Sequence, residues 1–381
     1  MTATSPNEPG SASVAPAEKR APGPRFRELD GLRGIAALAV VLYHFTSSYA
    51  AKAPEAPRAF HDFAWGEYGV QLFFLISGFV ILMSAWRARR PTDFAISRAA
   101  RLYPAYWISL AVAVVLLLWR PMPGFPVDPA TVAANVTMVQ RWFLMPNVVD
   151  VYWTLAVEMQ FYVVVFLLLV LTRCRLSVRV LLWAAGAWTA LSWAVILAAF
   201  RVTTENPQSD PTWVKLLTNG TVAEYGPLFI TGMLFYLVRE GRVRVPWALA
   251  SAASTVLGAT LLRGVEHGVH VAVVCVVFAV VVLRRRTGVL LLAPVQWFGK
   301  VSYSLYIMHT VAGFLVIDAL WPHLGIHGAI LVAVAVVSAL SWLVWRVGEQ
   351  WLGREAKRGL TRVRAALDGR TGRAPEEVTS R

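Results

Sequence analysis

Ten long apolar segments, joined by short polar connections, constrain the fold of this chain more than any other feature of its sequence. A helix that crosses the hydrocarbon core of a bilayer needs about 20 mostly apolar residues. The sequence therefore predicts an all-α polytopic membrane protein with about ten transmembrane helices. We place them at residues 32–50, 66–86, 103–119, 151–171, 179–200, 221–238, 246–263, 268–283, 302–320 and 328–346.

The charged residues indicate topology rather than a nucleic-acid partner. They make up 15% of the chain, against roughly 25% in soluble domains. Although the net charge is +14, the basic residues form short clusters before the first segment and after the second, fourth, sixth, eighth and tenth. By the positive-inside rule, both termini and the even-numbered connections are predicted to be cytoplasmic. We expect a multi-pass protein of a bacterial-type cell membrane that binds no nucleic acid.

The sequence divides into three regions. Residues 1–24 are rich in Pro, Ala and Ser and lack large apolar side chains, so they are predicted to form a disordered tail. Residues 25–346 form the predicted membrane domain. Residues 347–381 are rich in basic residues and are predicted to form a cytoplasmic C-terminal tail.

The first segment, RELDGLRGIAALAVVLYHF, carries two ionisable residues, Arg33 and His44. Eleven helical steps separate them by roughly 16 Å and about three turns, so their side chains share one face. Arg33 is expected at the inner interface and His44 in the middle to outer half of the bilayer. Ionisable groups at that depth are costly and usually functional. The alternative is a neutral His44 bonded to a neighbouring helix, with Arg33 reaching to the interface.

The fourth segment carries a carboxylate, Glu158, about two turns below its outer end. This depth is similar to that of His44, and a carboxylate beside a histidine supports a general base. Two alternatives stay open at this point. The pair could only join two helices, or it could be a proton relay in a transporter of a small anionic molecule. A transporter would favour inverted repeats, and the sequence shows no internal repeat.

The stretch FAISRAARLYPAYW carries Arg98 and Arg101, which lie three residues apart and hence on one helical face. Arginine binds phosphate through two parallel hydrogen bonds, so the pair indicates a phosphorylated cosubstrate such as a nucleotide or coenzyme A. The alternative is a topology signal that also binds lipid headgroups.

Other polar residues in the apolar segments receive structural interpretations. Ser77 lies in a stretch with small residues and has no nucleophile-elbow pattern around it, so it is predicted to serve helix packing. His309 is predicted to hydrogen-bond between helices, because an isolated histidine lacks a catalytic partner. His323 and His327 have helical metal-ligand spacing, but a nearby proline and glycine disfavour a regular helix. We therefore predict no metal site.

Five stretches, in this order, resemble the acyltransferase-3 family of integral membrane acyltransferases over about residues 27–346. They are RELDGLRGIAALAVVLYH, GVQLFFLISGF, SRAARLYPAYW, VYWTLAVEMQFY and GKVSYSLYIMH. The resemblance implies transfer of an acetyl or other short acyl group from acyl-CoA to a hydroxyl. The acceptor would be a sugar, an envelope polysaccharide or a secreted natural product such as a macrolide. The implied partners are acyl-CoA, the acceptor and the lipid bilayer, and no permanently bound cofactor is expected.

The resemblance also implies roles for individual residues. His44 falls on the family's histidine and is the expected catalytic base, with a covalent acyl-His44 intermediate as an open variant. Arg98 and Arg101 fall on its R-x-x-R pair, which is implied to hold the phosphates of acyl-CoA. Arg33 is assigned to donor binding. Glu158 falls on the acidic residue of W-[ST]-L-x-x-E and is assigned an orienting catalytic role.

Overall fold

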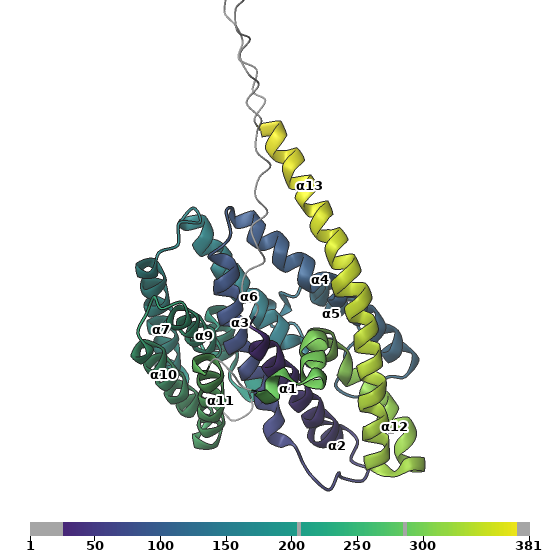
Figure 1. Cartoon of the computed structure of the whole chain (residues 1–381). Coiled ribbons are helices and arrows are strands. Elements are labelled where there is room, and N and C mark those ends of the chain that lie inside the picture. The colour runs from purple at the N-terminus through teal and green to yellow at the C-terminus, as the bar shows by residue number, and fades with distance from the viewer. Residues whose placement is uncertain (1–25, 204–206, 285–287, 372–381) are drawn as a thin grey trace, which may run out of the picture.

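The computed structural model describes residues 26–203, 207–284 and 288–371, and these residues form a bundle of helices without a strand (Figure 1). The described part contains nine helical stretches that are long and apolar enough to cross a membrane. The predicted all-α membrane class is therefore confirmed. The predicted tail at residues 1–24 lies outside the described residues, and the cytoplasmic placement of both termini stays a prediction.

The helices follow one another along the chain with short connections. Their bounds are α1 (Arg27–Tyr43), a π-helix (His44–Ser48), α2 (Tyr49–Lys52), α3 (Gly69–Ala85), α4 (Pro91–Trp119), α5 (Pro129–Val136), α6 (Tyr152–Leu171), α7 (Val178–Ala199), α8 (Thr212–Thr221), α9 (Gly226–Arg239), α10 (Val245–Arg263), α11 (Val265–Leu283), α12 (Ala293–Val344), a second π-helix (Trp345–Leu352) and α13 (Gly353–Thr371). Short 3-10 helices lie at Ala64–Tyr68, Gln140–Phe143, Pro207–Ser209 and Gly288–Leu291.

The last two predicted spans lie in one continuous stretch. The ninth stretch runs from Ala293 to Asp368 and includes both 302–320 and 328–346. Within α12 the backbone leaves helical geometry at Gly325, where φ is 67° and ψ is 166°. Side chains disfavour this left-handed φ, whereas glycine adopts it readily. The chain bends sharply there, so two predicted spans remain separate in space although they are counted as one stretch.

Two helices extend beyond the predicted boundaries. α4 begins at Pro91 instead of residue 103, with proline in its first turn and an N-terminal contact in which the Arg90 backbone N–H donates to Asp93 (3.1 Å). The basic segment after residue 346, predicted as a tail, is helical as far as residue 371 and packs along α4 as α13. Figure 1 shows α13 in yellow beside α4.

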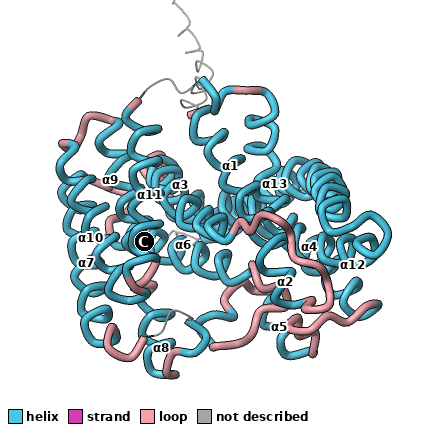
Figure 2. The backbone as a smooth tube through the Cα atoms, turned by 90° about the horizontal axis from the view of Figure 1, so that it is seen from below, coloured by secondary structure: helices cyan, strands magenta, loops and turns pink. Residues whose placement is uncertain are grey.

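The bundle has a central group of helices between two outer groups. Seen from below in Figure 2, α1, α3 and α6 lie between α7, α9 and α10 on one side and α4, α12 and α13 on the other. α1 packs on α12 and α3, and α3 packs on α9. Large apolar side chains such as Leu171 and Trp183, 81% and 75% exposed, point outward. Such a surface suits contact with lipid.

Glycines permit two close helix crossings. A Cβ atom added to Gly299 would lie 2.1 Å from the carbonyl oxygen of Asp30, so α1 and α12 touch backbone to backbone. A Cβ at Gly78 would lie 2.1 Å from the carbonyl oxygen of Phe229, which brings α3 equally close to α9. Small residues permit this approach between membrane helices. The first crossing holds Arg33 of α1 against the polar start of α12.

Candidate active site

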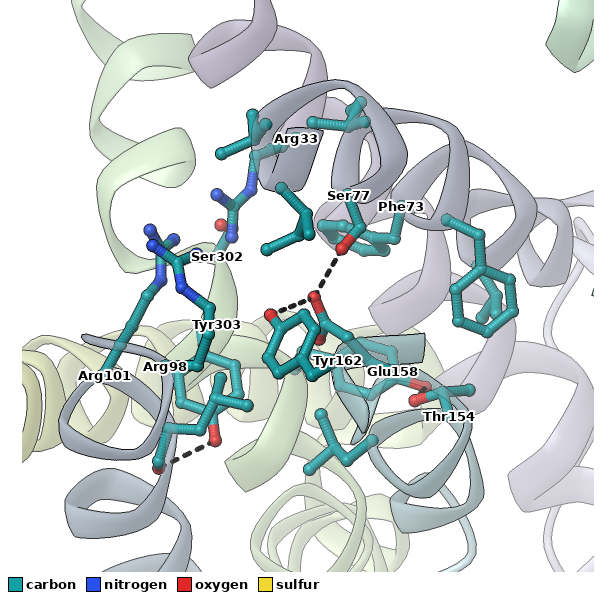
Figure 3. A pocket seen from close by; sticks show the side chains of 18 residues that line it. Arg33, Phe73, Ser77, Arg98, Arg101, Thr154, Glu158, Tyr162, Ser302 and Tyr303 are labelled. Carbon is teal, nitrogen blue, oxygen red and sulfur yellow. Dashed lines mark hydrogen bonds between the residues drawn. The ribbon is translucent and has the colours of Figure 1, made fainter. Parts of the chain in front are cut away.

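A narrow pocket of about 70 Å³ between α1, α3, α4, α6 and α12 contains four of the five predicted site residues. They are Arg33, Arg98, Arg101 and Glu158 (Figure 3). Much of the remaining wall is apolar and comes from α3. The pocket therefore joins three basic groups and one acidic group to a slot that suits an extended, largely apolar chain.

The three arginines gather on one side of this pocket, with their guanidinium groups close to one another (Figure 3). Among the described residues, none of the three forms an ion pair. The Nε of Arg98 is buried without a hydrogen-bond acceptor, and one Nη donates to the neighbouring Ser97 hydroxyl at 3.4 Å. Buried charged donors without a partner are costly. This arrangement fits a site for an anionic ligand.

Glu158 is held on the opposite side of the pocket by two hydroxyl groups. The Ser77 hydroxyl donates to Oε1 at 2.6 Å, and the Tyr162 hydroxyl donates to the same oxygen at 2.7 Å. Tyr162 lies one helical turn after Glu158 on α6, so the two side chains share a face. Both bonds are charge-assisted and therefore strong. They fix the carboxylate in the pocket without pairing it with an arginine.

A second, wider cavity of about 590 Å³ adjoins the narrow pocket. The two share the three arginines, which therefore lie at the neck between them. The wide cavity adds three more basic side chains, Lys300 of α12 and Arg354 and Lys357 of α13. Its acidic residues are Asp30 and Glu349, and the Ser304 hydroxyl donates to Glu349 at 2.6 Å. The cavity as a whole is strongly basic.

His44 lies where α1 changes into a π-helix, and it contacts a second histidine. Its Nδ1–H donates to the Val40 carbonyl at 2.9 Å, which leaves Nε2 as the basic nitrogen of the neutral ring. The His309 ring lies 4.8 Å away, centroid to centroid, at 75°. His309 uses Nδ1 in the same way, donating to the Tyr306 carbonyl at 2.8 Å, and its Nε2 is buried without a partner. The Nε2 atoms of two neutral imidazoles thus lie in one buried region.

The structure does not bring His44 and Glu158 into hydrogen-bond contact. Glu158 bonds to Ser77 and Tyr162, whereas His44 packs on His309 and lines neither of the two cavities described above. Tyr306 of α12 borders both the narrow pocket and the histidine pair. Tyr306 lines the narrow pocket, and its ring centroid lies 5.9 Å from that of His309. The hydroxyl of Thr154 donates to that of Tyr306 at 2.8 Å and holds the ring in place.

The residues that the sequence analysis interpreted as structural lie in different surroundings. Ser77 faces the pocket and bonds to Glu158, while the neighbouring Gly78 provides the close helix packing. Within the described residues, the hydrogen bonds of His309 go to carbonyls of its own helix, not to another helix as predicted, and its ring packs on that of His44. His327 accepts a hydrogen bond from the Phe60 backbone N–H at 3.1 Å. No group of three or more potential metal ligands occurs in the described residues.

Sequence reasoning missed several residues of the site. Tyr162 was detectable, because an acidic residue followed four positions later by tyrosine places both on one helical face. Arg354 and Lys357 were counted only as topology signals, and Lys300 received no role in the site. The position of Arg354 and Lys357 in the wide cavity depends on how α13 packs on α4, and local sequence patterns carry no information on that packing.

The comparisons with known proteins show the family of the chain. The family model described as an acyltransferase domain, the acyltransferase-3 family, matches residues 26–346. Acyltransferase MdmB of Streptomyces mycarofaciens is 28% identical over 75% of this chain and 78% of its own length. Exopolysaccharide production protein ExoZ of Rhizobium meliloti is 30% identical over 83% of this chain and 98% of its own length.

A shorter match is found with the peptidoglycan O-acetyltransferase OatA of Listeria monocytogenes, 29% identical over 36% of this chain and 23% of that protein. No solved structure matches the chain. The family and the relatives favour the enzyme over the transporter that the sequence alone left open. The family model matches most of the chain, and the described residues contain nine helical stretches that are long and apolar enough to cross a membrane. The chain therefore belongs to the acyltransferase-3 family and is a multi-pass membrane acyltransferase.

Proposed function

We propose that the protein transfers a short acyl group, acetyl or similar, from acyl-CoA to a hydroxyl group of its acceptor. The observation that carries this proposal is the neck between the two cavities. Three arginines without ion-pair partners in the described chain separate a wide basic cavity from a narrow, largely apolar pocket. Acyl-CoA has the matching shape and charge, because a phosphorylated head is joined to a slender pantetheine arm that ends in the thioester.

Each part of the donor has a counterpart in the site. Arg33, Arg98 and Arg101 bind the pyrophosphate at the neck, where guanidinium groups suit phosphate oxygens. The pantetheine arm enters the narrow pocket between α3 and α6. Glu158, fixed by its two hydroxyl donors, lies beside the arm and orients it. The acyl end then points toward Tyr306 at the far end of the pocket.

The transfer step uses His44 as the general base. Its free Nε2 takes the proton of the acceptor hydroxyl while the hydroxyl oxygen attacks the thioester carbonyl carbon. A carbon–oxygen bond forms, the carbon–sulfur bond breaks, and the thiolate of CoA takes the proton from His44. The Tyr306 ring lines the pocket and lies beside His309, and we expect it to move aside in this step.

The acceptor is a sugar, an envelope polysaccharide or a secreted natural product such as a macrolide. Two relatives, an exopolysaccharide production protein and a peptidoglycan O-acetyltransferase, support a sugar acceptor. Each of these acceptors carries the hydroxyl that the chemistry at His44 requires.

The proposal is tested by CoA release from labelled acetyl-CoA and longer acyl-CoAs by purified protein, with sugar and macrolide acceptors added in turn. We expect His44→Ala to abolish release. Arg98→Ala should raise the KM for acyl-CoA roughly 10- to 100-fold, because it removes charge-assisted hydrogen bonds to phosphate. Arg89→Ala is the matched control, since Arg89 is exposed and lines neither cavity.

Three results would contradict the proposal. The donor assignment fails if the wild-type protein neither binds nor consumes any acyl-CoA with any acceptor. The role of the neck fails if Arg98→Ala and Arg89→Ala have the same KM. The role of His44 fails if His44→Ala retains wild-type turnover.

A further inference from the structure

The basic residues of α13 differ in how their charges are compensated. Arg358 is paired with Glu355, and Arg364 is paired with Asp93 of α4. Arg354 and Lys357, which line the wide cavity, have no ion-pair partner among the described residues. The uncompensated charges of this helix thus include the two that face the cavity.

α13 is held firmly in the place where these two residues reach the cavity. A Cβ atom on Gly353 would lie 2.8 Å from the carbonyl oxygen of Ala100, and one on Gly348 would lie 2.7 Å from the Cα of Ala105. The helix therefore touches the α4 backbone immediately before Arg354. Farther along, the ion pair of Arg364 with Asp93 joins the same two helices.

Lys300 completes a cluster of three basic residues at the wide end of the cavity. It belongs to α12 and, like Arg354 and Lys357, lines the wide cavity but not the narrow pocket. The three arginines line both. The six basic side chains therefore form two sets, one at the neck and one farther out, which we call the outer cluster (Lys300, Arg354 and Lys357).

CoA carries phosphate at two separate places, a pyrophosphate next to the pantetheine arm and a 3′-phosphate on the ribose of adenosine. If the arm occupies the narrow pocket, the pyrophosphate lies at the neck and the ribose lies beyond it, in the wide cavity. We propose that the outer cluster binds the 3′-phosphate and so makes the enzyme selective for CoA over thioesters that lack it. This inference rests on the proposed function and assigns a new subsite within it.

The test compares acetyl-CoA with 3′-dephospho-acetyl-CoA as donors for the full-length protein in neutral detergent. The wild-type protein should prefer acetyl-CoA roughly 10- to 100-fold in kcat/KM, because charged hydrogen bonds to one phosphate are lost with the dephospho donor. The double variant Arg354→Ala/Lys357→Ala should lose this preference through a higher KM for acetyl-CoA alone. Arg358→Ala, the next residue on the helix but outside the cavity, should keep the preference.

A binding measurement covers the case in which the double variant is poorly folded. Adenosine 3′,5′-bisphosphate should compete with acetyl-CoA in the wild-type protein, and the single variant Lys300→Ala should weaken this competition. Lys300 is exposed, so its truncation leaves the helix packing unchanged. Repeating both assays with added phosphatidylglycerol identifies a lipid-headgroup site, which would bind that lipid and treat the two donors alike.

The outcomes separate this inference from the proposed function. If wild type consumes acetyl-CoA but shows no preference over the dephospho donor, or if the double variant keeps the preference, the 3′-phosphate subsite is refuted and the acyltransferase reaction stands. If wild type neither binds nor consumes either donor, the assignment of acyl-CoA as donor is refuted, and the subsite with it.

Discussion

The substitution Gly299→Ala tests the helix crossing on which the site depends. The added methyl group would lie 2.1 Å from the carbonyl oxygen of Asp30 and 2.7 Å from its carbonyl carbon. Both atoms belong to the backbone of α1, so no side chain can turn aside to make room. Ordinary van der Waals contact begins at 3.4 Å, and α1 must therefore move away from α12.

The expected loss of stability follows from two opposing effects. Overpacking of a tight interface costs about 1–3 kcal/mol, and more where backbone must move. Alanine in place of glycine within a helix recovers about 1 kcal/mol. Because both contacting atoms are backbone, the cost lies at the upper end of this range, and we expect a net destabilisation of about 2 kcal/mol, measured as a lower midpoint of thermal unfolding in detergent. Because α1 carries Arg33, the KM for acetyl-CoA should rise as well.

Gly186→Ala is the control with the opposite expected sign. Gly186 lies in α7, where an added Cβ atom meets nothing within 4 Å. The same chemical change should leave stability unchanged or raise it by up to about 1 kcal/mol. If Gly299→Ala unfolds at or above the wild-type midpoint, α1 and α12 do not cross backbone to backbone at this point, and the placement of Arg33 is wrong.

Three further predictions concern other parts of the molecule. Glu158→Gln removes the charge that strengthens two hydrogen bonds, so kcat should fall roughly 10- to 100-fold in steady-state CoA release; an unchanged kcat would exclude an orienting role. His309→Phe keeps an aromatic ring beside His44 but removes both nitrogens, so the pH profile of kcat should shift, whereas a purely structural residue would change only the unfolding midpoint. Arg263→Met removes the buried cation that bonds to both Glu224 and Asp210, which should cost about 3–5 kcal/mol in thermal unfolding; an unchanged midpoint would contradict the ion-pair network.

Local sequence patterns predicted most of the helices because apolar length is a local property. A membrane helix satisfies all its backbone hydrogen bonds within one segment, so each span can be recognised without knowing its neighbours. The predicted helix boundaries were less accurate where basic residues that indicate topology also lie within a helix and line the site. The basic stretch before residue 103 reads as a connection, yet it forms the first three turns of α4 and carries Arg98 and Arg101 on the helix itself.

Part of the site was also predicted correctly, because helical spacing is a local property of the sequence. Arg98 and Arg101 share a helical face whatever the fold, and they do meet Arg33 and Glu158 in one pocket. The contact between His44 and Glu158 was expected from similar depth alone. Residues at the same depth in the membrane can still lie on different sides of the bundle, and here Glu158 bonds to Ser77 and Tyr162 whereas His44 packs on His309.

The sequence by itself determined the membrane class, the approximate spans and the family, because these depend on apolar length and on motifs within single segments. The tertiary structure decided which of the polar residues share a cavity. In the folded chain, Ser77 donates a hydrogen bond to Glu158, His309 packs on His44, and α13 lines the basic cavity. Each of these results depends on the angle and closeness at which helices cross, and those are set by contacts between residues far apart in the chain.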